Sequence, residues 1–190
     1  MRLLAIVISS LSFLFTSVAF AKGDCKNTST TTKDILQCVT NLYEKSDKKL
    51  NEQYSKMVAP LGFPKRISLI ETERAWIKYR DAHCNEIYES IFPGEEAEIE
   101  KIGCLISLTS SRLVELFHLD TGISGDSFYN TLSFISSISS KSKGEILSHI
   151  ESLEKRLEET DYYKKNCKLT KSIYDEDERL CHARLKFQSI

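Results

Sequence analysis

The stretch Cys84-Asn-Glu-Ile-Tyr-Glu-Ser-Ile-Phe-Pro-Gly94-Glu-Glu-Ala-Glu-Ile-Glu-Lys-Ile-Gly-Cys104 decides the fold. Two helix-like segments flank its Pro-Gly turn, and each cysteine lies ten positions from Gly94. If the segments fold back as an antiparallel hairpin, the two sulfur atoms arrive at the same height. The spacing therefore predicts a disulfide between Cys84 and Cys104 that clamps a helical hairpin in an exported protein.

Apolar residues on both sides of this hairpin recur at helical intervals. They predict helices over about 65–91 and 96–119. An earlier helix is expected to start at a cap formed by Thr31 with Asp34 and to end before Pro60. In the helix over 65–91 we expect one apolar row to hold Ile70, Ile77, Cys84 and Ile91, with Trp76 and Tyr79 beside it.

Beyond Asp126 the composition becomes serine-rich, but helical spacing continues. Two further apolar series predict one helix each: Ile146, Ile150, Leu153 and Leu157, and then Leu169, Ile173, Leu180 and Phe187. No segment alternates with the period of a strand. We therefore predict an all-α fold, a disulfide-stapled antiparallel helical bundle. The expected division is 1–21, a signal peptide; 22–120, a helical domain; and 127–190, a C-terminal helical extension.

The chain has six cysteines, an even set that allows 15 pairings. Besides the hairpin pair, the short spans favour two further bridges, Cys25 with Cys38 and Cys167 with Cys181. In each of these pairs we expect the first cysteine to precede a helix and the second to lie within it. Each bridge would then tie incoming chain back onto its helix.

The N-terminal segment predicts export. Arg2 is followed by an apolar run over 3–15 and by the small-residue cleavage site Ala19-Phe20-Ala21. The run is too short to span a bilayer, so we expect cleavage near Lys22 and no membrane insertion afterwards. A periplasmic or secreted protein is predicted.

Composition and motifs exclude several classes of function. A formal net charge of −1 excludes the strongly basic face of a nucleic-acid-binding protein. No glycine-rich phosphate loop, His-Glu-x-x-His motif or paired Cys-x-x-Cys occurs, and the four histidines are scattered. We expect no metal, no cofactor and no enzymatic activity. A hydrolase with an unrecognised site is the remaining enzymatic alternative.

Three motifs carry a family resemblance: Arg74-Ala-Trp-Ile-Lys-Tyr-Arg-Asp-Ala-His-Cys84, the Asp-x-x-Leu-Asn-x-x-Tyr element at 47–54, and Cys104 followed by Leu108-Thr109 and Arg112. Together with Cys25 and Cys38 they resemble the LprI-like family, named for a lysozyme inhibitor, over about 25–119. The structural signature implied by the resemblance comprises Asp47, Leu50, Asn51, Tyr54, Arg74, Trp76, Tyr79, Arg80, Asp81, Thr109 and Arg112.

The signature residues have a structural interpretation. We expect Arg80 or Arg112 to pair with Asp81 and to cross-link the two helices of the hairpin in a partly buried ion-pair network. Trp76, the only tryptophan, is expected in the core. Direct contact of these residues with a ligand is the alternative.

The resemblance implies an exported binding protein that inhibits a lysozyme-type muramidase by occluding its cleft, which holds two carboxylates. The expected contact is the turn Phe92-Pro93-Gly94-Glu95-Glu96, which replaces the Gly-Gly-Ser-like turn of many family members. Lys65 and Arg66, at the opposite end of the bundle, are the second candidate because cations suit a carboxylate cleft. An envelope interaction or scaffold module without lysozyme inhibition is the alternative function.

Overall fold

The computed structural model describes residues 31–123, 127–153 and 156–188. Every regular element in these ranges is a helix, which confirms the all-α prediction. The helices are α1 (Thr32–Val58), α2 (Arg66–Ile91), α3 (Ala97–Thr121), α4 (Ser127–Ile138), α5 (Lys143–Ser152), α6 (Leu157–Tyr174) and α7 (Glu178–Gln188). The predicted signal peptide and Cys25, with its predicted bond to Cys38, lie outside the described residues.

Local chemistry sets the ends of the three long helices. The Thr31 hydroxyl accepts a hydrogen bond from the Asp34 backbone N–H at 3.3 Å, as the predicted cap requires. α1 ends shortly before Pro60 and α2 shortly before Pro93. α3 ends at Gly122, whose φ of 74° is left-handed and whose N–H donates to the His118 carbonyl. The boundaries predicted from the sequence lie within two residues of these.

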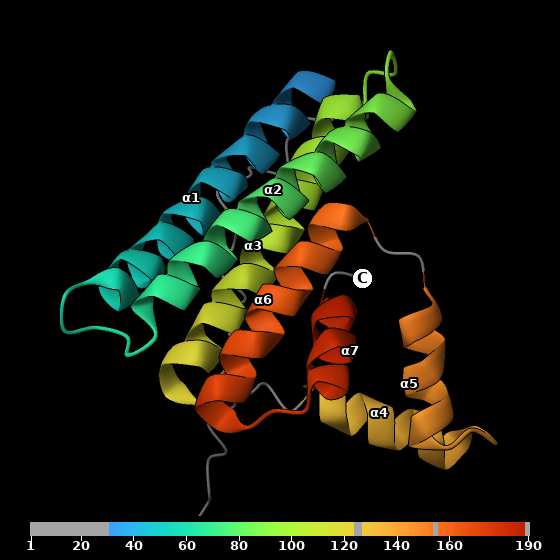
Figure 1. Cartoon of the computed structure of the whole chain (residues 1–190). Coiled ribbons are helices and arrows are strands. Elements are labelled where there is room, and N and C mark those ends of the chain that lie inside the picture. The colour runs from blue at the N-terminus through green and yellow to red at the C-terminus, as the bar shows by residue number, and fades with distance from the viewer. Residues whose placement is uncertain (1–30, 124–126, 154–155, 189–190) are drawn as a thin grey trace, which may run out of the picture.

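The three long helices form an antiparallel bundle in which α3 packs against both α1 and α2 (Figure 1). α1 and α2 contact each other over only a short stretch. By length and composition, α3 is the one described helix apolar enough to cross a membrane. Its packing against two neighbours accounts for that composition, because Leu108, Leu116 and Leu119 are buried in the core.

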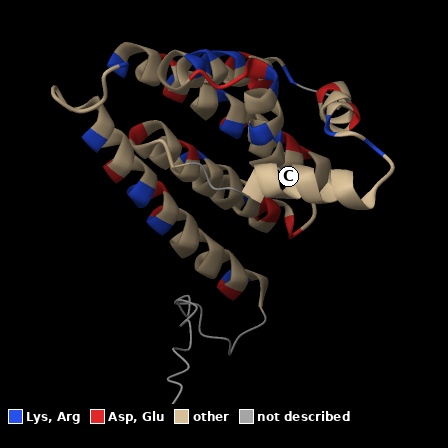
Figure 2. Cartoon of the chain, turned by 90° about the horizontal axis from the view of Figure 1, so that it is seen from below, with Lys and Arg blue, Asp and Glu red and all other residues tan. Residues whose placement is uncertain are grey.

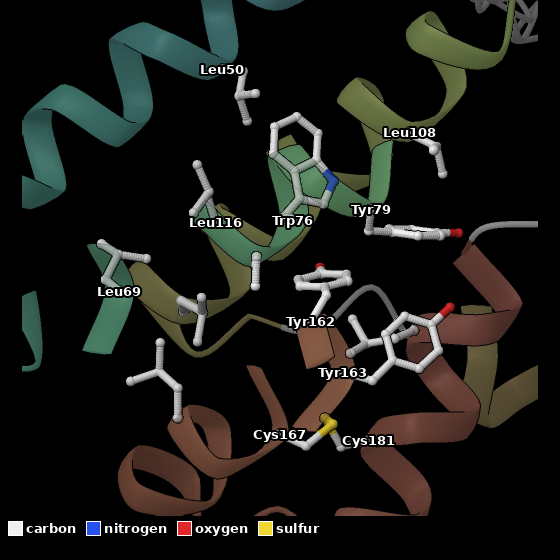
Figure 3. Packing of buried hydrophobic residues seen from close by; sticks show 14 of the residues in the cluster. Leu50, Leu69, Trp76, Tyr79, Leu108, Leu116, Tyr162, Tyr163, Cys167 and Cys181 are labelled. Carbon is white, nitrogen blue, oxygen red and sulfur yellow. A yellow bond between two sulfur atoms is a disulfide. The ribbon is translucent and has the colours of Figure 1, made fainter. Parts of the chain in front are cut away.

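The chain after residue 126 returns to this bundle. α6 lies along α2 and α7 packs against α6, while α5 packs against α4 and α7 (Figure 1). Tyr162 and Tyr163 of α6 join Trp76 and Tyr79 of α2 in the main hydrophobic core (Figure 3). A second, smaller core comprises Phe128, Leu132, Ile146, Leu147 and Ala183. Helices from both halves of the sequence thus share the main core.

Two helices were predicted with the wrong extent. The apolar series from Ile146 to Leu157 does not form one helix, because α5 ends at Ser152 and Leu157 begins α6 with 85 % of its surface exposed. The series from Leu169 to Phe187 is also divided, because Asp175 adopts a left-handed backbone conformation (φ 54°) between α6 and α7. Helical spacing continued across both breaks, so hydrophobic periodicity alone gave no indication of them.

Both predicted disulfides whose two cysteines are described are present. Cys84 and Cys104 join α2 to α3, with their Cα atoms 5.6 Å apart. Cys167 and Cys181 are bonded as predicted, also with Cα atoms 5.6 Å apart. The second bridge nevertheless differs from the expectation, because Cys167 lies inside α6 and Cys181 inside α7. It joins two helices instead of tying incoming chain to one.

Candidate functional site

A network of buried charges lies where α2, α3, α6 and α7 meet. Arg112 of α3 has a fully buried side chain and donates through Nε to Oε2 of Glu73 on α2 at 2.8 Å. The Nη1 of Arg112 donates to Oδ1 of Asn166 at 2.8 Å and to the Tyr162 hydroxyl at 3.3 Å, both on α6. Burial acts to lower the pKa of Arg112, but the charges of Glu73, Tyr162 and Glu115 and the hydrogen bond to Glu73 together outweigh it, and the pKa is raised.

The second half of this network joins α3 to α7. Glu115 is fully buried and accepts a hydrogen bond from Nδ2 of Asn166 at 2.6 Å. It also pairs with Arg184 of α7, whose Nε donates to Glu176 at 2.8 Å. Burial acts to raise the pKa of Glu115, yet the charge and hydrogen bonds of Arg184 and Asn166 lower it below its usual range. Glu115 and Arg184 therefore stay charged inside the protein.

The ion pairs differ from those predicted. Neither Arg80 nor Arg112 links α2 to α3 through Asp81, because Asp81 lies on α2 beside Arg80 and binds it there at 2.8 Å. Arg112 uses Glu73 instead. Arg80 approaches α1, where Asp47 lies 3.7 Å from its Nη1. An ion pair does link α2 to α3, but its acid is Glu73, about two helical turns before the expected Asp81.

The structure divides the signature residues among three environments. Asp47, Leu50, Asn51 and Tyr54 of α1 and Arg74, Trp76 and Arg80 of α2 line one groove, named here the α1–α2 groove. Tyr79, Thr109 and Arg112 are buried in the core, where the Tyr79 ring lies 5.9 Å from that of Tyr162. Asp81 stays on the surface beside Arg80.

One candidate contact surface is the turn between α2 and α3. The Gly94 N–H donates to the Ile91 carbonyl at 2.8 Å, and a Cβ atom on Gly94 would lie 2.9 Å from that oxygen. Phe92 is 59 % exposed, with its ring 5.6 Å from that of Tyr88. Glu95 and Glu96 follow on the surface. This end of the bundle therefore presents one aromatic ring next to negative charge.

The loop between α1 and α2 lies at the opposite end of the bundle (Figure 1). The Phe63 N–H donates to the Met57 carbonyl at 2.8 Å, and both side chains are buried. At Gly62 a Cβ atom would lie 2.6 Å from two backbone oxygens, so only glycine fits without movement. The loop is therefore fixed in shape while Leu61 at its tip is fully exposed.

Positive charge gathers next to this loop. Lys65 and Arg66 are exposed, and their side chains form no ion pair within the ranges that the structure describes. Lys65 also lines a pocket of about 480 Å³ between α2 and α6, which holds Lys164 and Lys168 of α6 as well. The apolar side chain of Ile67, 75 % exposed, lies one residue beyond Arg66. We name residues 59–67 the basic tip.

Charges of both signs interleave along the long helices, whereas α4 carries none (Figure 2). Within the described residues, no group of three or more histidine, cysteine, aspartate or glutamate side chains is placed to hold a metal ion.

Sequence reasoning missed Leu61, Ile67 and the partners of the buried arginines. The Pro-Leu-Gly-Phe-Pro run at 60–64 marks a tight loop and could have drawn attention to Leu61. The buried partners Glu115, Asn166 and Arg184 had no such marker, because they lie up to 69 positions apart in the chain.

Comparison with known families agrees with the motifs. The model of the family described as lysozyme inhibitor LprI matches residues 25–116. No curated protein and no solved structure matches the chain. The match includes α1, α2 and most of α3, and therefore both candidate contact surfaces and the α1–α2 groove. Residues 25–116 of this chain are therefore similar to the family of lysozyme inhibitor LprI.

Proposed function

We propose that this protein is an exported inhibitor of lysozyme-type muramidases that acts by blocking the enzyme's cleft. The family match supports a lysozyme-directed role. The N-terminal pattern and two disulfides are typical of exported proteins. The role is that of a binding protein and requires no chemistry of its own.

The basic tip is the surface that suits this target best. A lysozyme-type cleft holds two carboxylates that flank the scissile bond. Leu61, fully exposed at the apex, offers apolar contact, while Lys65 and Arg66 offer positive charge without a competing ion pair in the described chain. This combination on a loop of fixed shape is the observation that carries the proposal, because a preorganised loop loses little entropy on binding.

The opposite end of the bundle suits the cleft less well. Glu95 and Glu96 at the turn between α2 and α3 would be repelled by the catalytic carboxylates. Lysozymes of animals are usually basic outside the cleft, so this turn would act by steering the encounter. Since the two ends lie apart, one inhibitor molecule uses one of them in the cleft.

The test is a titration of cell-wall lysis by an animal lysozyme with the oxidised mature protein. We expect lysis to fall with added protein, and the double variant Lys65→Glu/Arg66→Glu to raise the half-inhibitory concentration at least about tenfold, equivalent to about 1.4 kcal/mol. The matched double variant Glu95→Gln/Glu96→Gln at the other end should keep full inhibition at low ionic strength, apart from a slower onset.

Two results would overturn this proposal. Undiminished lysis at large molar excess of the native protein would exclude inhibition of that enzyme. If Lys65→Glu/Arg66→Glu still inhibits and Glu95→Gln/Glu96→Gln does not, the contact with the enzyme lies at the turn between α2 and α3 instead.

An envelope scaffold without lysozyme inhibition is the second candidate. The observation that favours it is the outer face of α4, which lies outside the family match and exposes Phe134 and Ile138 by 61 % and 68 %. Exposed apolar side chains on an uncharged helix suit a protein partner. The same lysis titration separates the two functions, because a scaffold leaves the enzyme fully active.

A further inference from the structure

The α1–α2 groove has a shape and a chemistry that neither the fold nor lysozyme inhibition requires. α1 and α2 both pack against α3 and barely touch each other, which leaves an opening of about 340 Å³ between them. This volume lies in the range of small-molecule sites. Two sequence motifs that are some twenty positions apart line its two walls.

Part of the lining is held rigidly. The Asn51 side-chain amide donates to Oδ2 of Asp47 at 2.8 Å, one turn earlier on α1. The Arg80 guanidinium lies 4.9 Å from the centre of the buried Trp76 ring and is bound by Asp81. A carboxylate, an amide and a guanidinium are thus fixed on the two walls, and the contact with the Trp76 ring holds the planar guanidinium in place.

The remaining polar groups of the groove are unused. Arg74 is exposed, and within the described chain its guanidinium has no hydrogen bond or ion pair. The hydroxyl groups of Tyr43 and Tyr54 likewise donate to no residue in those ranges. Burial raises the pKa of both tyrosines, so their hydroxyls are neutral donors at physiological pH. Groups that the fold does not use remain available to a ligand.

The balance of charge decides the class of ligand. Glu73 is paired with Arg112 and Arg80 with Asp81, which leaves the cation Arg74 and the anion Asp47, so the groove has no net charge. A phosphate or carboxylate would meet the carboxylate of Asp47, and an ammonium group would meet the guanidinium of Arg74. A neutral molecule with many hydroxyls meets donors and acceptors in equal measure.

Tyr43 and Tyr54 set the length of the α1–α2 groove and add apolar surface to it. Tyr43 and Tyr54 are eleven residues apart on α1, or about 16 Å at 1.5 Å per residue. Their partly buried rings add aromatic surface that suits the C–H side of a sugar ring. Planar amide, carboxylate and guanidinium groups can bind neighbouring hydroxyls in pairs. We propose that the α1–α2 groove binds an uncharged oligosaccharide.

The protein contains its own reporter for the test. Trp76 is the only tryptophan of the chain and forms the floor of the groove, beneath Arg80. We expect its fluorescence to change saturably when the folded, oxidised protein is titrated with a neutral tetrasaccharide, either of N-acetylglucosamine or of glucose. Amide NMR shifts should be confined to α1 and α2.

Two small substitutions test the contacts. Arg74→Ala and Tyr54→Phe each remove groups that hold no part of the fold together, and each should weaken binding about 5- to 10-fold through lost hydrogen bonds. Lys164→Ala, in the pocket between α2 and α6, is the matched control and should leave the affinity unchanged. Circular dichroism of each variant confirms that it is folded.

Three outcomes would overturn the proposal. The first is the absence of a saturable response to either tetrasaccharide up to about 10 mM, where even a millimolar site is mostly filled. The second is equal affinity in Arg74→Ala, Tyr54→Phe and the native protein. The third is binding of acidic oligogalacturonate but of neither neutral tetrasaccharide. None of these measurements contains a muramidase, so this proposal and lysozyme inhibition fail independently.

Discussion

Replacing Arg184 by methionine tests the buried network most directly. The substitution keeps an unbranched side chain of similar length but removes the cation that pairs with Glu115 and Glu176. Glu115, fully buried, would keep only its hydrogen bond from Asn166 at 2.6 Å. Breaking one partner of a buried ion pair typically costs about 3–5 kcal/mol. We expect Arg184→Met to lower the free energy of unfolding by that amount, a large part of the about 5–15 kcal/mol of a typical domain.

The assay is urea unfolding at pH 7 of oxidised protein, followed by far-UV circular dichroism. Arg179→Met on the same helix is the matched control, because its ion pair with Glu151 is exposed and should contribute less than about 1 kcal/mol. The double variant Arg184→Met/Glu115→Leu should recover part of the loss, since it removes the unpaired charge of Glu115, while Glu176 keeps its hydrogen bond from Tyr129. A loss below about 1 kcal/mol in Arg184→Met, or no recovery in the double variant, would refute the argument.

Three further predictions concern separate parts of the molecule. Replacing Cys84 and Cys104 together by alanine should lower the free energy of unfolding in urea by about 3 kcal/mol, because the bridge closes a loop with a sequence separation of 20; a loss below about 1 kcal/mol would contradict this. Gly62→Ala should lower the thermal unfolding midpoint, because its Cβ would lie 2.6 Å from backbone oxygens. Gly103→Ala should raise the midpoint, because its Cβ would meet open space inside a helix. Equal shifts in the two variants would show that the contact at Gly62 is harmless. Burial lowers the pKa of His83, so below pH about 6.5 the unfolded chain takes up a proton that the folded chain does not. The free energy of unfolding should therefore fall as the pH decreases through that value. An NMR titration midpoint of His83 at or above about 6.5 would exclude this.

The sequence predicted the parts of the fold that local chemistry determines. The Pro93-Gly94 turn and the equal spacing of its flanking cysteines correctly gave the hairpin of α2 and α3 and its disulfide. The apolar row predicted for α2 was right only in part. Cys84 and the neighbouring Trp76 are buried as expected, but Leu69 is buried as well and Ile77 is 40 % exposed. α6 lies along α2 and draws the large aromatic side chains inward, and a single helix considered alone gives no information about such a neighbour.

The candidate sites were predictable to different degrees. Seven residues named from the motifs line the α1–α2 groove, but the sequence did not predict their common location, because it depends on how α1 and α2 diverge. Glu73 lies next to the quoted motif, whereas Asn166 and Arg184 lie far along the chain. Buried ion pairs between distant helices follow from the three-dimensional packing, and no local pattern in a single sequence encodes them.

The packing of α6 along α2 has a consequence for how this protein can vary. Glu73 and Arg112 lie within the family match, and their partners Tyr162 and Asn166 lie beyond it. A chain shortened after α3 would leave that charged pair open to water on one side and the ring of Tyr79 uncovered. Related chains that lack the tail should therefore shield this pair by other means, whereas in chains that keep the tail the two sides of the contact should vary together. A graft of the LprI segment onto another protein would need α6 and α7 to travel with it.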